Sequence, residues 1–405
     1  MTLADRKRVD LREVLRVTCA ASPVEAIDVM ADGLADLTGA TQVQFLITNV
    51  THRAVVRFAG SDANAARLQE ENEQVPVIPL RGSAYDNVLR RQQVVRVGED
   101  GGERILVPVT ESGDALGVID LHLPREADAQ VFADIGTVAA ALARVVVASR
   151  RHSDLLDWAQ DTAPFSLAAE IQRRLLPGSY TCETPRFTVA GWLEPANAVG
   201  GDTFDYALDR DTLHLSVTDA VGNDVNAALL ASVLLGSLRN SRRRGADLAR
   251  QARTANDALA AHAHTGQFVT GQLARVDLDS GTMTFVNAGH PFPYRVRDGR
   301  VSPIELDIDM PFGLYAGRDL RLQSIQLEPG DRVVLITDGM LERNAEDLDL
   351  PAMLHREARM HPRELVYELA ETVLHATGGD LEDDATVLCL DWRGHRDDDR
   401  TERGG

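Results

Sequence analysis

The sequence has almost no lysine and little cysteine. Lys7 is the only lysine among 42 Lys and Arg residues, a bias that reflects a GC-rich genome and to which we assign no function. The three cysteines are odd in number and lie far apart, at positions 19, 182 and 389. This spacing fits neither a disulfide framework nor a zinc site, so it predicts free thiols in a reducing cytoplasm.

Long hydrophobic runs and excess positive charge are also missing. One of the longest apolar runs, 138–148, is interrupted by Arg144 and is shorter than the about 20 residues that span a bilayer. The N-terminus becomes charged within seven residues and has no signal-peptide core. The net charge of −20 repels phosphate backbones and anionic lipids. We therefore expect a cytoplasmic protein whose partners include neither nucleic acid nor membrane.

The chain is long enough for two or three domains, at 405 residues with 44% hydrophobic content. Its first part reads as helix, strands and helix, at about 22–37, then 43–50, 54–58, 105–109 and 116–123, then 128–150. This order predicts an α/β module over residues 21–150, preceded by an N-terminal helix in residues 1–20. The expected last hairpin, with its turn at 111–114, resembles that of a GAF sensory domain.

A jointed helical segment follows the α/β module. The closing helix is expected to continue through residues 151–160, where apolar surface remains at Leu155, Leu156 and Trp158. Pro164 interrupts it, and a new helix begins at Ser166. We interpret residues 151–178 as a connector. It either forms a homodimer and relays a signal, or merely tethers two domains.

The second half changes to alternating strand patterns separated by turns, with helical stretches grouped between them. Helices outside antiparallel sheets predict a layered α+β sandwich for residues 179–393. The charged, glycine-ended segment 394–405 is expected to be a disordered tail.

Four aspartate-bearing signatures are spread through this second half. They are Val199-Gly200-Gly201-Asp202, Thr218-Asp219-Ala220-Val221-Gly222, Thr337-Asp338-Gly339 and Asp383-Asp384-Ala385-Thr386. Carboxylates that converge on one cleft repel each other by roughly 3 kcal/mol per close pair at an effective dielectric constant of about 20, unless cations neutralise them. All-oxygen ligands select hard ions such as Mg²⁺ or Mn²⁺. The signatures therefore predict a metal site.

Together with further landmarks, these signatures resemble the PPM-type metal-dependent serine/threonine phosphatases of the bacterial sigma-factor-regulator subfamily. The further landmarks are Glu170–Pro177, Asn287-Ala288-Gly289-His290-Pro291, Met310–Leu314 and Pro329-Gly330-Asp331. The resemblance implies two stacked antiparallel sheets flanked by helices, an αββα sandwich. It also implies two Mn²⁺ or Mg²⁺ ions as cofactors, an arrangement suited to phosphoryl transfer.

By the same resemblance, the catalytic residues are the four metal-binding aspartates. Asp219 would bridge both ions, Asp202 and the backbone carbonyl of Ala220 would serve one ion, and Asp338 and Asp383 the other. Three further carboxylates near these ligands are candidates for a supporting role, namely Asp205, Asp224 and Asp384. His290 is either a phosphate contact or, more commonly for such a position, a strand-end histidine bonded to backbone. Met310, Phe312 and Leu314 are expected to pack the core near the site.

One residue departs from the family pattern. Asp224 stands where the subfamily usually has the second glycine of the turn after the bridging aspartate. Our prediction is a protein phosphatase acting on phosphoserine or phosphothreonine of an anti-anti-sigma-type regulator, controlled by a small-molecule or protein activator at the GAF-like module. The alternative is a catalytically weak or inactive signalling scaffold, toward which only Asp224 points.

Overall fold

In the computed structural model, the described residues are 10–61, 76–99, 101–160, 166–196, 200–222, 225–264, 266–341, 348–378, 381 and 383–394. The chain divides into two compact units, Met1–Pro164 and Phe165–Gly405. The boundary lies inside the segment predicted to be a connector.

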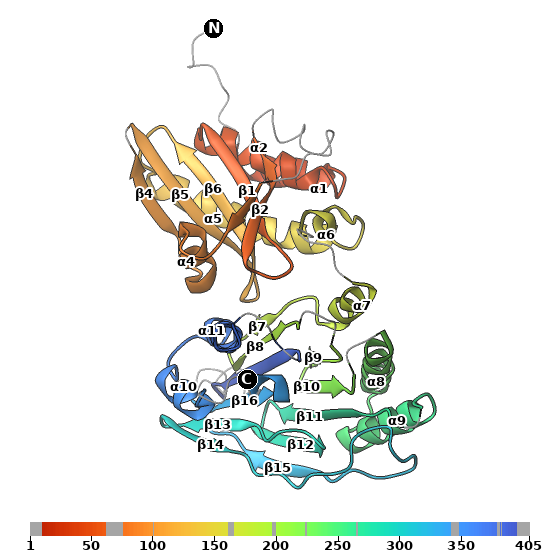
Figure 1. Cartoon of the computed structure of the whole chain (residues 1–405). Coiled ribbons are helices and arrows are strands. Elements are labelled where there is room, and N and C mark those ends of the chain that lie inside the picture. The colour runs from red at the N-terminus through yellow and green to blue at the C-terminus, as the bar shows by residue number, and fades with distance from the viewer. Residues whose placement is uncertain are drawn as a thin grey trace, which may run out of the picture. The chain divides into compact units, whose positions relative to one another are not determined.

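The N-terminal unit is a six-stranded antiparallel sheet with helices on both faces (Figure 1). Its strand order is β3-β2-β1-β6-β5-β4. The elements are α1 (Leu11–Ala20), α2 (Ala26–Thr38), β1 (Gln42–Thr48), β2 (Ala54–Gly60), β3 (Val77–Pro79), α4 (Ala84–Arg91), β4 (Val95–Glu99), β5 (Gly102–Glu111), β6 (Asp114–Leu123), α5 (Ala129–Ser149) and α6 (Leu155–Gln160). The predicted hairpin is confirmed: Glu111 pairs with Asp114, and Ser112 and Gly113 both have positive φ, as a two-residue type I′ turn requires.

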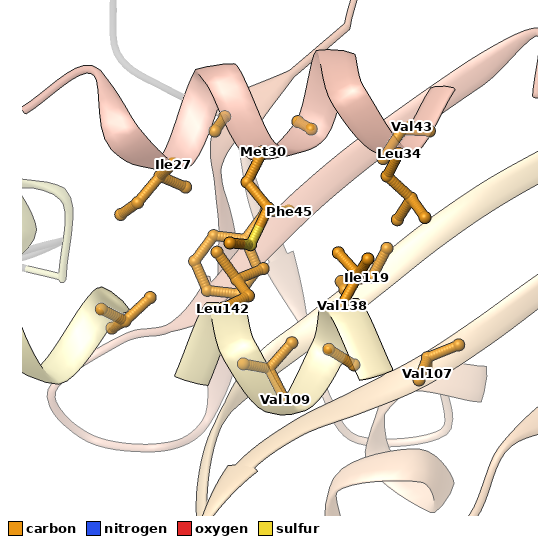
Figure 2. Close-up of a cluster of buried hydrophobic side chains, with 14 of the residues drawn as sticks. Ile27, Met30, Leu34, Val43, Phe45, Val107, Val109, Ile119, Val138 and Leu142 are labelled. Carbon is orange, nitrogen blue, oxygen red and sulfur yellow. The ribbon is translucent and has the colours of Figure 1, made fainter. Parts of the chain in front are cut away.

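Alternating side chains of the strands supply two separate cores in this unit. Phe45 and Ile119 pack with Met30 of α2 and Leu142 of α5 on one face (Figure 2). On the other face, Leu46 packs with residues of α4. Successive strand residues point to opposite faces, so a strand covered on both sides is apolar at nearly every position. The structure thus has the predicted helices and sheet, and a GAF identity stays a prediction.

Helix α5 ends earlier than predicted. The helix expected to continue through residues 151–160 stops at Ser149, and α6 is a separate helix. Leu156 is buried in the core of the N-terminal unit, whereas Trp158 is half exposed. Among the described residues, α5 alone is long and apolar enough, by length and composition, to cross a membrane. Its residues Ile135 and Val138 are buried against the sheet, as in the core helix of a globular protein.

The C-terminal unit has two antiparallel sheets. The five-stranded sheet has the order β15-β12-β11-β10-β9 and the six-stranded sheet has the order β14-β13-β16-β17-β8-β7. The strands are β7 (Thr181–Glu183), β8 (Phe187–Glu194), β9 (Thr203–Leu208), β10 (Thr212–Ala220), β11 (Val269–Asp277), β12 (Thr282–Ala288), β13 (Tyr294–Arg297), β14 (Arg300–Pro303), β15 (Gln323–Gln326), β16 (Arg332–Ile336) and β17 (Ala385–Trp392). The helices are α7 (Leu167–Leu175), α8 (Val225–Arg243), α9 (Leu248–Ala260), η1 (Asp338–Leu341), α10 (Leu350–Arg356) and α11 (Pro362–Ala376).

These elements form the four layers of an αββα sandwich (Figure 1). Val189 of β8 and Leu388 of β17 share one core with Leu215 of β10 and Phe285 of β12, so the two sheets pack face to face. Helices α8 and α9 cover the outer face of the five-stranded sheet, while α10 and α11 cover that of the six-stranded sheet. The predicted layered architecture is therefore present in this unit.

Candidate metal centre

Asp202 lies just before β9 and is buried, with 1% of its surface exposed. The hydroxyls of Thr337 and Thr386 donate to its Oδ2, at 2.7 and 2.6 Å. Both threonines belong to the other sheet's aspartate signatures, so this pair of hydrogen bonds joins three of the four signatures. Burial raises the pKa of Asp202 well above its ordinary value, and the charges of Asp219 and Asp384 raise it further.

Asp219 stands near the end of β10, which lies between β9 and β11 in the five-stranded sheet. Burial raises its pKa to about 7, with added repulsion from Asp338, Asp383 and Asp384. Burial and the neighbouring carboxylates both disfavour the charged form of Asp219, so a nearby cation is needed to stabilise that form. The structure thus couples the predicted bridging ligand electrostatically to the aspartates of the other two signatures.

The third and fourth signatures meet through the backbone. Asp338 is exposed at the start of η1, and a side chain at Gly339 would come within 2.0 Å of the backbone oxygen of Asp384. The Asp384 amide donates to Asp383 Oδ1 at 2.8 Å, and burial raises the pKa of Asp383. Glycine next to Asp338 is therefore required because two backbone segments touch there.

The first and second signatures are equally close. A Cβ at Gly201 would lie 2.2 Å from the carbonyl oxygen of Ala220, the group predicted to bind one cation. The Ala220 amide donates to the Gly201 carbonyl at 3.3 Å. The glycine before Asp202 thus lets the strand ends approach.

Asp384 is more deeply placed than its supporting role predicted. Only 1% of its surface is exposed. The Ala196 amide donates to its Oδ1 at 2.9 Å, and the Gln172 side chain donates to its Oδ2. Burial raises the pKa of Asp384 to about 6, although these hydrogen bonds oppose the shift.

The donor set suits hard divalent cations. It consists of carboxylates and one backbone carbonyl, the ligands of Mg²⁺ and Mn²⁺. Within the described ranges, no three Asp, Glu, His or Cys side chains lie close enough to hold one ion together. Mg²⁺ is usually bound by one or two carboxylates and keeps several waters, so the residues present fit such an ion.

Asp205, in contrast, is engaged elsewhere. It is buried on β9, and its carboxylate accepts hydrogen bonds from Arg239 at 2.9 Å and from Arg242 at 3.2 Å, both on α8. Arg239 also donates to the Leu175 carbonyl at the end of α7, at 2.6 Å. Asp205 therefore ties strand β9 to α8, and Arg239 extends the connection to α7. Asp224 lies outside the described residues.

His290 has the features of a structural residue. It is 2% exposed, its Nδ1 lies 2.9 Å from Thr270 Oγ1, and its amide donates to Asn287 Oδ1 at 2.8 Å. Burial lowers its pKa to about 4, so the ring is neutral at pH 7. The hydrogen bond of the ring is thus to a threonine hydroxyl, whereas the strand-end role predicted a backbone group, and the burial of the ring favours a structural role over a phosphate contact.

Gln172 of α7 is the site residue that sequence reasoning passed over. Besides Asp384, its Nε2 donates to the backbone carbonyl of Asp202 at 2.9 Å, and the side chain is buried. It falls within the landmark Glu170–Pro177, but only the packing of α7 shows what the amide contacts.

Comparisons with known proteins bear on this unit. The family model for Stage II sporulation protein E (SpoIIE) matches residues 209–393, which include Asp219, Asp338, Asp383 and Asp384 but not Asp202. The C-terminal unit contains a SpoIIE/PP2C-type phosphatase domain. The prediction of a PPM-type phosphatase domain of the sigma-factor-regulatory kind is thereby confirmed.

Individual relatives of this phosphatase domain are distant. The phosphoserine phosphatase RsbU of Bacillus subtilis is 23% identical over 252 residues, covering 60% of this chain and 75% of RsbU. Stage II sporulation protein E of B. subtilis is 24% identical over 199 residues, 47% of this chain and 24% of that protein. Among solved structures, the RsbU and RsbW domains of a Mycobacterium tuberculosis protein give a TM-score of 0.48 at 27% identity, over 52% of this chain and 61% of that one.

Proposed function

We propose that this chain is a metal-dependent protein phosphatase that hydrolyses phosphoserine or phosphothreonine on a regulatory protein of the anti-anti-sigma type. One observation carries the proposal. Five aspartates from four separate signatures lie at one edge of the sandwich, namely Asp202, Asp219, Asp338, Asp383 and Asp384. Hydrogen bonds and close backbone contacts connect the segments that carry them. The charges of neighbouring carboxylates in this set also raise the pKa of Asp202 and of Asp219.

The residues at this edge have different proposed roles, either binding a cation or positioning the ligands. Asp219, the Ala220 carbonyl and Asp202 would hold one cation, and Asp338 and Asp383 would complete the site for a second. When bound, two such ions supply a water of lowered pKa and neutralise charge on the phosphate oxygens. Thr337 and Thr386 orient Asp202 by holding its Oδ2. Asp384 and Gln172 fix the spacing of the strand ends.

The proposal includes control by the N-terminal unit, which would act as a sensor for a small molecule or a protein. The support is that α6 packs in the first unit, through Leu156, while α7 packs in the second and reaches the site through Gln172. The short segment between these helices would carry the signal. We further propose a cytoplasmic homodimer. The sequence suggested Leu156 and Trp158 as apolar surface for dimer contacts. Leu156 is buried within its own unit, so of these two only Trp158, which is half exposed, supports the homodimer.

A second candidate is a phosphatase-fold scaffold without turnover. The sequence feature that points to it is Asp224, which stands where the subfamily usually has a glycine. The two candidates differ in metal-dependent hydrolysis.

The deciding experiment is hydrolysis of para-nitrophenyl phosphate by the full chain in Mn²⁺ and Mg²⁺ series, beside Asp338→Asn. We expect turnover that requires metal and falls at least a hundredfold in the variant. Equal rates for both proteins, or turnover in excess chelator, would refute the proposal. Absence of turnover together with absence of metal binding by calorimetry would support the scaffold.

A further inference from the structure

The segment between β14 and β15 exposes apolar side chains on an otherwise charged protein. Ile308, Met310 and Tyr315 are each more than half exposed, and Leu322 is nearly so. Phe312 between them is fully buried, so the expectation of a buried position is confirmed for Phe312 and wrong for Met310 and Leu314. We call the exposed part of residues 308–322 the apolar shelf.

The part of the apolar shelf around Phe312 lies near the candidate metal centre. Phe312 forms an antiparallel bridge with Val269, the first residue of β11, and Val269 pairs with Ala220 of the second aspartate signature. Neighbouring strands lie about 4.8 Å apart, so the backbone of Phe312 is roughly 10 Å from that of Ala220. A protein bound over the metal centre covers about 800 Å², so its footprint reaches the shelf.

The protein holds this segment firmly, although it leaves apolar surface in water. The buried Asn256 of α9 donates to the Tyr315 carbonyl at 2.8 Å and accepts from the Gly313 amide at 3.0 Å. The Asp257 carboxylate accepts from the Gly317 amide at 2.6 Å. A surface ordered before binding loses less conformational entropy when a partner docks.

A small hollow opens on the shelf. It measures about 350 Å³ including the space at its mouth. Its lining combines apolar and polar residues with three charged ones, namely Asn256, Met310, Pro311, Tyr315 and Leu320 with Asp309, Arg318 and Asp319.

The two carboxylates that line the hollow, Asp309 and Asp319, are each paired with an arginine. Arg321 bonds to Asp309 at 2.8 Å, Arg253 bonds to Asp319 at 3.0 Å, and the Arg318 guanidinium lies over the Tyr315 ring. Because these carboxylates are neutralised by arginines, the hollow favours an uncharged side chain of a bound protein.

We infer that the apolar shelf is a docking site for the phosphoprotein substrate, and that it receives an apolar side chain about three residues from the phosphorylated residue. The separation follows from the roughly 10 Å between Phe312 and Ala220 and the 3.3 Å rise per residue of an extended peptide. This inference rests on the proposed phosphatase function and adds a preference among substrates.

The test uses two phosphoserine peptides that are identical except for leucine or serine at the third position on each side of the phosphoserine. The full chain with Mn²⁺ is compared with the double variant Met310→Ser/Tyr315→Ser, and each kcat/KM is divided by the same enzyme's value for para-nitrophenyl phosphate. Leu208→Ser is the matched control, because Leu208 is similarly exposed but ends β9 at the far end from Asp202. We expect the native protein to prefer the leucine peptide about fivefold to tenfold, and the double variant to lose that preference.

A leucine-to-serine ratio near one in the native protein would overturn the inference, as would a ratio unchanged in the double variant or lost equally in Leu208→Ser. Binding of the same peptides, measured by fluorescence anisotropy, separates docking from chemistry. If the protein shows no turnover but binds the leucine peptide more tightly than the double variant does, the apolar shelf is supported as a docking site and the phosphatase proposal is refuted.

Discussion

Gln172 and Asp384 are joined by a buried hydrogen bond across 212 residues of sequence. The same amide nitrogen of Gln172 donates to the Asp202 carbonyl at 2.9 Å. One side chain of α7, the first helix of the C-terminal unit, thus contacts two of the predicted metal-centre segments. The position of α7 and the spacing of those segments are therefore linked.

Replacing Gln172 tests this link. We expect Gln172→Leu to leave the Asp384 carboxylate buried with one donor fewer, which costs about 1–3 kcal/mol of folding free energy. Gln172→Glu should be worse for metal-dependent activity, because it places a further carboxylate against Asp384. Turnover of para-nitrophenyl phosphate and thermal unfolding check both variants. Arg174→Leu, at an exposed position of the same helix, is the control, and equal effects in all three would contradict a role for the amide.

Removing metal should destabilise the phosphatase domain, because its carboxylates repel each other. Binding to the folded state alone adds about 2.7 kcal/mol at a hundredfold excess over Kd. Asp219→Asn removes a carboxylate whose pKa is raised to about 7. We expect it to raise the melting temperature in chelator and to abolish the further rise on adding Mn²⁺. Calorimetric melting with and without Mn²⁺ measures both effects, and a variant that keeps the Mn²⁺ response would rule out Asp219 as a ligand.

Asp205 separates a structural role from metal binding. Its buried carboxylate accepts from two arginines, and breaking such a pair costs about 3 kcal/mol because charge is left without its partner. We expect Asp205→Asn to lower the free energy of unfolding by roughly this amount and to leave the Mn²⁺ Kd within about twofold. Urea denaturation and calorimetry measure the two quantities. A tenfold change in Kd at unchanged stability would return Asp205 to the metal site.

Regular patterns in the sequence predicted most of this fold. Alternating residues in β10 and β12 and the turn at 111–114 identify strands and a hairpin, because both are local properties of the chain. Strand β9 is harder to recognise, because it carries Asp205 in its interior. We predicted that this carboxylate supports the metal ligands, whereas it pairs with two arginines of α8 that are distant in sequence. The break after Ser149 was also missed, since the charged residues that follow contain no glycine or proline.

In the candidate site, too, local features could be predicted from the sequence, whereas contacts between distant segments could not. The aspartates were visible because each stands beside a glycine or at a strand end, and the structure gives a reason in the close approach of Gly339 to Asp384. Gln172 was not identifiable, because its importance depends on where α7 docks. The orientation of Asp202 by two threonines likewise arises from strands that are distant in sequence.

Acid should destabilise the phosphatase domain partly through His290. Its folded pKa of about 4 lies below the unfolded value of about 6.5, because burial disfavours the charged ring. The neutral ring's stabilising contribution is complete above pH 6.5 and is lost as pH falls from 6.5 toward 4, by about 1.4 kcal/mol per unit. Between pH 7 and pH 5 we therefore expect His290→Gln to lose about 2 kcal/mol less stability than the native protein. Hydrogen exchange of β11 and β12 peptides measures this, with the exposed His262→Gln as control, and an identical pH response in all three proteins would show that His290 is not the titrating group.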